Sequence, residues 1–276
     1  MAYAIDLTGK VAIVTGGSRG LGLAIVRGLA HAGARIAVVS RKLDACETVA
    51  ASLRNGGADA RAYACHVGRW DEIAPFVDRV YADFGRVDVL VNNAGMSPSY
   101  ASLEDISEAY FDSVIGVNFK GPFRLTALVG SRMKNDGGGS IVNISSVGSL
   151  VPAPHALPYG GAKAALNSMT ESFAAAFAPA VRVNTVCVGP FATDVAQHWA
   201  DPPDPDRPGW SRGGQRIGEP HEAVGAVLYF ASDLASFTNG TLLRVDGGPP
   251  WTYLRAARTQ QPWLDATQLP PATEGD

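Results

Sequence analysis

The chain has 276 residues, of which 46% are hydrophobic and 18% charged, and its formal net charge at pH 7 is -3. This length and apolar content suffice for one large α/β domain with a substantial core. The scattered Lys and Arg argue against nucleic-acid binding, which needs a basic patch. No apolar stretch approaches the length of a membrane span, and the first residues lack the basic and apolar blocks of a signal peptide. We therefore expect a cytoplasmic protein without a membrane segment.

The three cysteines, Cys46, Cys65 and Cys187, cannot form a complete set of disulfides. None of them stands in a C-x-x-C pair or beside a cluster of histidines, which are the usual signs of a cysteine metal site. The sequence therefore predicts core or near-surface thiols and no bound metal.

The predicted elements alternate along the chain between apolar strands and helical patterns. This alternation indicates a doubly wound Rossmann fold in a single α/β domain, with a seven-stranded parallel sheet and helices on both faces. The ligand site of such a fold lies beyond the carboxyl ends of the strands. The strands are expected near residues 10–15, 34–40, 60–65, 87–92, 140–145, 181–188 and 241–246.

A glycine-rich turn follows the first predicted strand and leads into an amphipathic helical pattern that begins near Leu23. Gly16, Gly20 and Gly22 allow the backbone to turn sharply and to approach a pyrophosphate at the positive end of a helix. The spacing differs from the G-x-G-x-x-G fingerprint, because three residues rather than one separate the first two glycines. On its own, such a turn is weak evidence of a dinucleotide site.

Tyr159 and Lys163 stand four residues apart in a helical pattern, so both side chains project from one helix face. An ammonium beside a phenol favours the phenolate and lowers the tyrosine pKa from its usual value of about 10. Such a tyrosine can exchange a proton with a substrate oxygen near neutral pH. Taken in isolation, this spacing more often marks a surface tyrosine and a solvated lysine.

Four motifs occur in one order: T-G-x-x-x-G-x-G from Thr15, the segment 92–95, Ser146, and Y-x-x-x-K from Tyr159. Over about residues 6 to 250 the chain resembles the short-chain dehydrogenase/reductase family in its single-domain form. The resemblance implies hydride transfer between a nicotinamide cofactor and a small carbonyl or secondary alcohol, as in a ketoreductase or a 3-oxoacyl reductase. It also implies that Tyr159 is the general acid or base and that no metal takes part.

The resemblance implies a catalytic set of Asn118, Ser146, Tyr159 and Lys163. Ser146 lies thirteen residues before Tyr159, which is the family spacing, and would donate a hydrogen bond to the substrate oxygen. Without the tyrosine and the lysine, Ser146 would be explained as a hydroxyl that ends a strand with a local backbone bond. Lys163 would hold the nicotinamide ribose and lower the pKa of Tyr159, and Asn118, on the long helix before the fifth strand, would hold a water that links Lys163 to solvent.

The end of the second strand indicates the choice of cofactor. NAD-dependent enzymes typically carry an acidic residue there, whereas this chain has Ser40 followed by Arg41. Together with Arg19 in the glycine turn, Arg41 suits a dianionic 2′-phosphate, so NADP(H) is expected in preference to NAD(H). The full set of expected cofactor-binding residues is Gly16, Ser18, Arg19, Gly20, Leu21, Gly22, Ser40, Arg41, His66, Val67, Asn92, Ala94, Gly95, Tyr159, Lys163, Gly189 and Thr193.

Two positions depart from the family pattern. His66 stands where most relatives carry an Asp that bonds the adenine amino group, so its contact with adenine depends on its tautomer. The alternative is a loop histidine satisfied within the protein. Gly189 follows Val188 instead of the usual proline, which leaves the exact contact of Thr193 with the nicotinamide open.

The expected domain covers residues 1–250 and includes a substrate lid at about 190–219, and a C-terminal extension follows at 251–276. The family resemblance further implies a homotetramer in which the helices around Asn118 and Tyr159 pair with symmetry mates. Apolar positions on the second of these helices that look exposed in the sequence support this weakly. They are Leu166, Met169, Phe173 and Phe177.

Alternative functions remain at this stage. An NAD-linked alcohol or hydroxysteroid dehydrogenase is disfavoured by Arg41. A catalytically idle dinucleotide-binding redox sensor is disfavoured by the complete catalytic set. A sugar-nucleotide epimerase would need a further substrate-binding segment, which this chain lacks. The sequence does not specify the substrate, because relatives with the same catalytic residues act on many carbonyls and alcohols.

Overall fold

The computed structural model describes residues 4–151, 153–194 and 217–248. The C-terminal extension expected at 251–276 lies outside the described residues. So does most of the lid expected at 190–219, of which only the two ends are described. Within the described part of the chain, no helix is long and apolar enough to cross a membrane.

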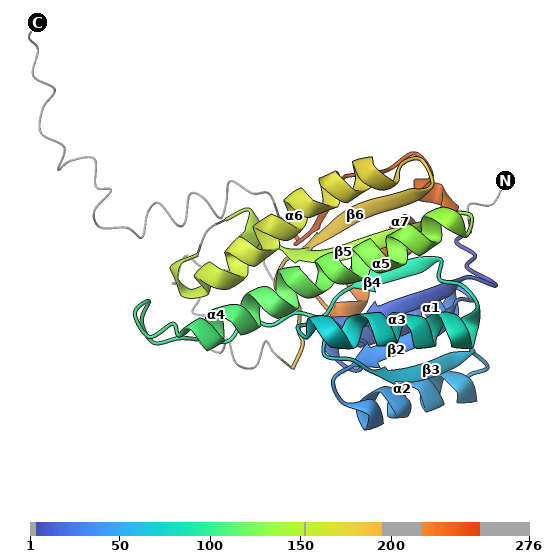
Figure 1. The fold of residues 1–276 in the computed structure, drawn as a ribbon, viewed down its shortest axis with the longest axis horizontal. Helices are drawn as coiled ribbons and strands as arrows, with labels where there is room; N and C mark the ends of the chain where they lie inside the picture. Colours follow the sequence, from blue (N-terminus) through green and yellow to red (C-terminus); the bar gives the residue numbers. More distant parts are fainter. Residues whose placement is uncertain (1–3, 152, 195–216, 249–276) are drawn as a thin grey trace, which may run out of the picture.

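The core of the molecule is a seven-stranded parallel sheet with strand order β3-β2-β1-β4-β5-β6-β7 (Figure 1). Each predicted strand is present within about two residues of its expected ends. The order reverses between β1 and β4, which is the switch point at which such sheets bind ligands. The strands are β1 (Val11–Thr15), β2 (Arg35–Ser40), β3 (Ala60–Ala64), β4 (Val89–Asn92), β5 (Gly139–Ser146), β6 (Val181–Val188) and β7 (Leu242–Val245).

Helices cover both faces of the sheet, which confirms the doubly wound fold. Along β1, Val11 and Ile13 belong to the hydrophobic cluster under α3, α5 and α6, whereas Ala12 and Val14 belong to the cluster under α1, α2 and α7. In Figure 1, α3, α5 and α6 lie in front of the sheet. The helices are α1 (Gly20–His31), α2 (Leu43–Asn55), α3 (Trp70–Phe84), α4 (Glu108–Ile115), α5 (Gly121–Asn135), α6 (Leu157–Phe177) and α7 (Val224–Ala231).

A chain of buried hydrogen bonds ties α5 and α6 to the middle of the sheet. Asn92 Nδ2 on β4 donates to Thr126 Oγ1 on α5 (3.0 Å) and to Asn143 Oδ1 on β5 (2.8 Å). Asn143 Nδ2 donates to Thr170 Oγ1 on α6 (2.9 Å), which also accepts from Thr185 Oγ1 on β6 (2.9 Å). All five side chains are buried, so these bonds are not exchanged with water.

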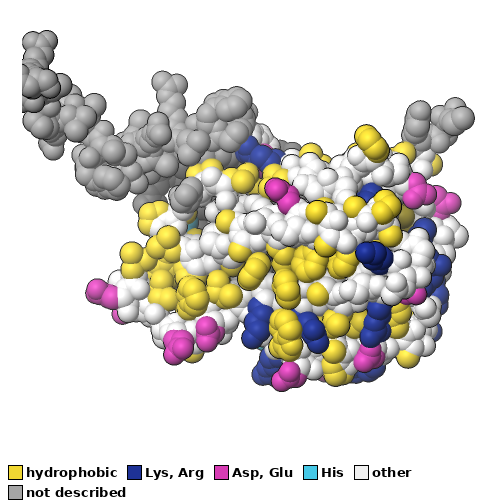
Figure 2. Space-filling model, turned by 45° about the horizontal axis from the view of Figure 1, so that its top comes forward, with side chains coloured by type: hydrophobic (Ala, Val, Ile, Leu, Met, Phe, Trp, Pro, Cys, Tyr) yellow, Lys and Arg dark blue, Asp and Glu magenta, His cyan; other side chains and the backbone are white. Residues whose placement is uncertain are grey.

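Four apolar positions on α6 were predicted to be exposed, and this prediction was wrong for three of them. Leu166, Met169 and Phe177 are buried within their own chain, and Phe173 is half-buried. Periodicity could not separate a core-facing stripe from an exposed one, because both repeat with the helical period. Phe123 on α5 is 40% exposed and lies against Phe173 with a centroid distance of 5.5 Å. Hydrophobic side chains do gather on the face shown in Figure 2.

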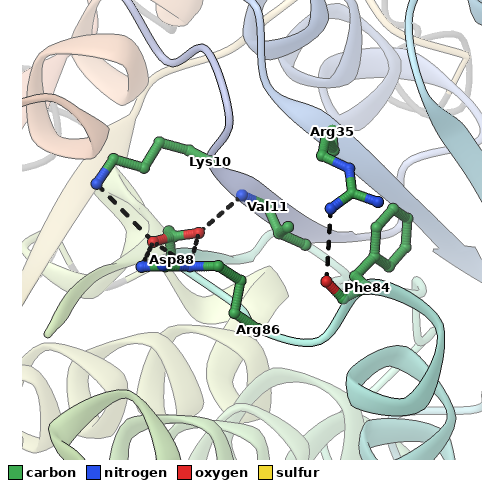
Figure 3. A network of polar contacts seen from close by, with 6 residues as sticks. All are labelled: Lys10, Val11, Arg35, Phe84, Arg86 and Asp88. Atoms are coloured by element: carbon green, nitrogen blue, oxygen red, sulfur yellow. Dashed lines mark hydrogen bonds and ion pairs between the residues drawn. The ribbon is translucent and has the colours of Figure 1, made fainter. Parts of the chain in front are cut away.

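At the amino edge of the sheet, a buried carboxylate joins the start of β1 to the segment that enters β4 (Figure 3). Asp88 is 4% exposed and accepts from Val11 N–H at 2.9 Å and from Arg86 Nη2 at 2.5 Å. Lys10 Nζ lies 3.8 Å from the same carboxylate. The Arg86 contact raises the pKa of that guanidinium, first through the hydrogen bond to Asp88. Asp88 therefore anchors the entry to β4 against the start of β1.

Replacing Asp88 with Asn should lower the free energy of unfolding by about 2 kcal/mol, because an uncharged amide leaves the Arg86 contact and the Val11 N–H poorly satisfied. Urea denaturation measures this as a lower midpoint at an unchanged slope. Lys10→Ala is the matched control, and its effect should stay below about 0.5 kcal/mol, since that pair is long and half-exposed. Equal losses in the two variants would contradict an anchoring role for Asp88.

Candidate functional site

The predicted site residues meet at the carboxyl edge of the sheet. The glycine turn leaves β1, the segment 93–95 leaves β4, Ser146 ends β5, and Gly189 follows β6. All of these strands are parallel, so their carboxyl ends lie along one edge. Ser146 and Val188 are direct partners across β5 and β6, which brings the ends of those two strands to the same level.

The glycine turn forms a close backbone cradle at the N-terminus of α1. Gly16 has φ +66° and Gly20 has φ +53°, conformations that favour glycine. A Cβ atom at Gly22 would lie 2.1 Å from the Gly16 carbonyl oxygen, so a larger residue would not fit there. The first turn of α1 carries no acidic residue. This cradle fits a pyrophosphate held by helix N–H groups.

Other cofactor-binding candidates from the turn and from the loop after β6 lie around this cradle. A Cβ atom at Gly20 would lie 3.3 Å from Thr193 Cβ, so the structure brings Thr193 to the turn. Gly189 packs closely on the end of β7, where its Cβ atom would lie 2.8 Å from Asp246 Cα. Ser18 and Leu21 are half-buried within the turn, and the Leu21 side chain packs on the core.

Two residues that we did not single out hold the turn in place. Thr15 Oγ1 accepts from the backbone N–H groups of Asn93 (3.0 Å) and Ala94 (3.1 Å). Asn93 Nδ2 donates to the Thr15 carbonyl at 2.8 Å. Both residues stand inside the motifs quoted from the sequence, but a motif does not reveal that its two halves bond to each other.

Asn92 and Gly95 lie in different surroundings, although both were predicted to contact the cofactor. The Asn92 side chain is buried and takes part in the hydrogen-bond chain under α5 and α6, so it lies in the interior and not along the cleft. Gly95 is exposed, and a Cβ atom there would lie 3.0 Å from Asn118 Oδ1 and 3.6 Å from Lys163 Nζ. Two of the predicted catalytic side chains therefore meet at Gly95.

Asn118 lies in a π-helical segment, Gly116–Lys120, between α4 and α5, where we had expected one long helix. Asn118 Nδ2 donates to the carbonyls of Met96 (2.7 Å) and Val114 (2.9 Å), and its Oδ1 accepts from Met96 N–H (3.2 Å). The side chain is fully buried. π-Turns within helices often occur at functional sites. Here the π-helical turn contains Asn118, whose side chain binds the backbone of Met96, the residue after Gly95.

Ser146, Tyr159 and Lys163 form a compact group above β5. Lys163 Nζ donates to the Ile144 carbonyl at 2.8 Å and lies 5.8 Å from the centroid of the Tyr159 ring. Ser146 Oγ accepts from Gly148 N–H at 3.2 Å, which leaves its own proton free to donate. A hydrogen bond from Ser146 favours ionisation of Tyr159.

Burial dominates the electrostatics of this group. It raises the pKa of Tyr159, and the Ser146 hydrogen bond opposes this only in part. Burial also lowers the pKa of Lys163 to about 8. The sequence had predicted a lowered tyrosine pKa because the lysine charge was assumed to act without a desolvation cost. In the folded chain that cost is the larger effect.

Two cations, one in the glycine turn and one directly after β2, have no ion-pair partner among the described residues. Arg19 and Arg41 are exposed, and no ion pair joins either of them to another residue of the described ranges. Ser40 is engaged locally, since its Oγ accepts from Cys46 Sγ at 3.0 Å and donates to the Lys42 carbonyl at 3.2 Å. Both guanidinium groups therefore remain available to an anionic ligand.

His66 and Val67 follow β3 at the same edge. His66 Nδ1 accepts from Gly68 N–H at 3.2 Å, so a neutral His66 carries its proton on Nε2. The histidine borders a cavity of about 350 Å³ next to the start of the π-helical segment, whereas Val67 is buried. Among the described residues, no group of three or more His, Cys, Asp or Glu could hold a metal.

The chain belongs to the short-chain dehydrogenase/reductase family. The family model described as short chain dehydrogenase matches residues 10–204. These proteins are oxidoreductases that bind a nicotinamide cofactor and act on CH–OH or C=O groups.

Among its relatives, Dehydrogenase/reductase SDR family member 4 of Homo sapiens is 34% identical over 246 residues, covering 88% of each chain. D-threitol dehydrogenase of Mycolicibacterium smegmatis is 35% identical over 243 residues, covering 88% of this chain and 93% of that one. A solved gluconate 5-dehydrogenase of Burkholderia cenocepacia J2315, in complex with NADP and tartrate, is 32% identical with a TM-score of 0.83. The match covers 88% of this chain and 96% of the gluconate 5-dehydrogenase chain.

The lowered pKa of Lys163 has a consequence for stability. Between pH 8 and 10.5 the unfolded chain binds more protons at this lysine than the folded chain, so the folded state gains stability as the pH rises. Lys163→Met removes this titration. From pH 7 to pH 10 the wild type should therefore gain about 2 to 3 kcal/mol of unfolding free energy relative to the variant. Urea denaturation of both proteins at the two pH values measures the difference, and a constant difference would disprove the lowered pKa.

Proposed function

We propose that the protein is an NADP(H)-dependent oxidoreductase that transfers a hydride between the nicotinamide and a carbonyl or secondary alcohol. The observation that carries the proposal is the group formed by Ser146, Tyr159 and Lys163 beside Gly95, at the edge that bears the glycine turn. With Asn118 the catalytic set is complete, which argues against an idle redox sensor. A ketoreductase or 3-oxoacyl reductase is the activity that we propose.

The nicotinamide supplies or accepts the hydride. Tyr159 gives a proton to the substrate oxygen in reduction and removes it in oxidation, and Ser146 donates a second hydrogen bond to that oxygen. Lys163 provides positive charge near the Tyr159 ring when it is protonated, which offsets part of the cost of a half-buried phenolate. Its bond to the Ile144 carbonyl keeps the ammonium in position.

The test is a panel of ketones, 3-oxoacyl thioesters and the matching alcohols, assayed with both nicotinamide cofactors. Two relatives are named for D-threitol and for gluconate, so polyols and sugar acids belong in the panel. Turnover should depend on Tyr159. Tyr159→Phe should lower kcat by about a thousandfold, because the proton donor is lost, while the Kd for NADPH stays close to the wild-type value.

Tyr229→Phe is the matched control for that variant, since Tyr229 lies on α7, away from the site, where its hydroxyl bonds to Thr238. It should leave kcat unchanged. A Tyr159→Phe enzyme with near-native kcat on any accepted substrate would show that another group is the acid. The absence of turnover in the wild-type enzyme across the whole panel would count against the proposed activity.

The preference for NADP(H) rests on Arg19, Arg41 and the lack of an acidic residue at Ser40. Arg41→Asp should lower the ratio of kcat/KM for NADPH to that for NADH by about tenfold or more, through lost pairing and added repulsion. Lys134→Asp makes the same charge change at an exposed position in the last turn of α5 and should leave the ratio unchanged. If the two variants change the kcat/KM ratio equally, Arg41 does not bind the 2′-phosphate.

We propose further that the protein is a cytoplasmic homotetramer in which α5 and α6 pair with symmetry mates. The support comes from Phe111 and Phe123, which are 47% and 40% exposed, and from the hydrophobic side chains gathered on one face (Figure 2). Within the proposed domain of residues 1–250, the segment 190–219 is proposed as the substrate lid. Residues 251–276 are proposed as a C-terminal extension, of which residues 251 to about 268 pack across a subunit interface.

A further inference from the structure

The segment that connects β4 to α4 is fixed at two points on the site. Near its start, Met96 exchanges two hydrogen bonds with the side chain of Asn118. Four residues later, the Tyr100 hydroxyl donates to the Pro154 carbonyl and accepts from Leu157 N–H at 3.0 Å. Residues 96–100, here called the strap, therefore reach from the π-helical segment to the N-terminus of α6.

A second tyrosine supports the strap from α4. Tyr110 on α4 donates from its hydroxyl to the Pro98 carbonyl at 2.5 Å. Its ring meets that of Tyr100 edge-on, with a centroid distance of 5.9 Å. Of these two hydroxyls, only that of Tyr100 links the strap to α6.

The bond from Leu157 matters because a helix N-terminus has N–H groups with no partner inside the helix. Ala156, at the N-cap position of α6, has no side chain that can accept a hydrogen bond, and Pro158 has no N–H. The Tyr100 oxygen takes the place of the missing cap. Leu157 lies two residues before Tyr159, so this bond fixes the turn of α6 that carries the proposed acid.

We propose that Tyr100 is a positioning residue for the reaction, which joins the strap to the first turn of α6 and so fixes Tyr159 with respect to the substrate. The proposal rests on the proposed function, in which Tyr159 transfers the proton. The strap then forms one wall of the substrate space. It is anchored at one end by Asn118 and at the other by the helix that carries Tyr159 and Lys163.

Tyr100→Phe and Tyr110→Phe test this as a matched pair, because each removes one hydroxyl that donates to a proline carbonyl and keeps the ring contact. In the full-length protein, Tyr100→Phe should increase amide hydrogen exchange in the first turn of α6 by about tenfold. It should also lower kcat per folded enzyme by about tenfold and raise KM for the carbonyl substrate, with an unchanged Kd for NADPH. Tyr110→Phe should leave α6 exchange, kcat and KM at their wild-type values.

A merely structural role would lower the melting temperature of both variants and leave kcat per folded enzyme unchanged, and that result would overturn the proposal. Unchanged exchange in α6 of Tyr100→Phe, or equal exchange in the two variants, would also overturn it. The exchange measurement needs no substrate. A wild-type enzyme without turnover would therefore refute the proposed function, while the exchange data still decide whether Tyr100 fixes the start of α6.

Discussion

The amide of Asn143, buried at the centre of the sheet, is bonded at both ends, and the position of α6 depends on it. Its oxygen accepts from Asn92 and its nitrogen donates to Thr170. Inside a dry core these bonds are costly to lose, because no water replaces them. Thr170 lies seven residues after Lys163, on the same face of α6. The contact that fixes Thr170 therefore also fixes the height of Lys163 and Tyr159 above the sheet.

Charged side chains have different partners at the two edges of the sheet. At the amino edge, Asp88 is paired with Arg86 and bonded to the Val11 backbone, so these charges stabilise the fold. At the carboxyl edge, Arg19 and Arg41 form no ion pair within the described residues and lie near the end of the glycine turn and of β2. A cation without an internal partner contributes little to stability and can bind an external anion. This separation lets one edge hold the sheet together while the other binds ligands.

Lys163 is buried and Tyr159 is half-buried, and this sets a constraint on the chemistry of the proposed catalytic pair. Removal from water disfavours both the phenolate of Tyr159 and the ammonium of Lys163, as the raised and lowered pKa values of the two groups reflect. Each charge is therefore easier to form when an opposite charge is near. The proton transfer that we propose at Tyr159 would consequently depend on exact placement, to which the buried bonds under α6 and the Tyr100 bond at its start would both contribute.

The sequence alone determined the family, the seven strands and the identity of the residues that converge at the site, because apolar periodicity and motif spacing are local properties of the chain. It did not determine how each side chain is used. The side chain of Asn92, a residue assigned to the cleft, is buried in the core, and Leu166, Met169 and Phe177 looked exposed but are buried.

The roles of Thr15, Asn93 and Tyr100 as links between distant segments were also absent from the sequence prediction. Only the tertiary structure decided these points. Which face of a strand or helix is covered, and whether burial outweighs a neighbouring charge, depends on contacts between residues far apart in the chain.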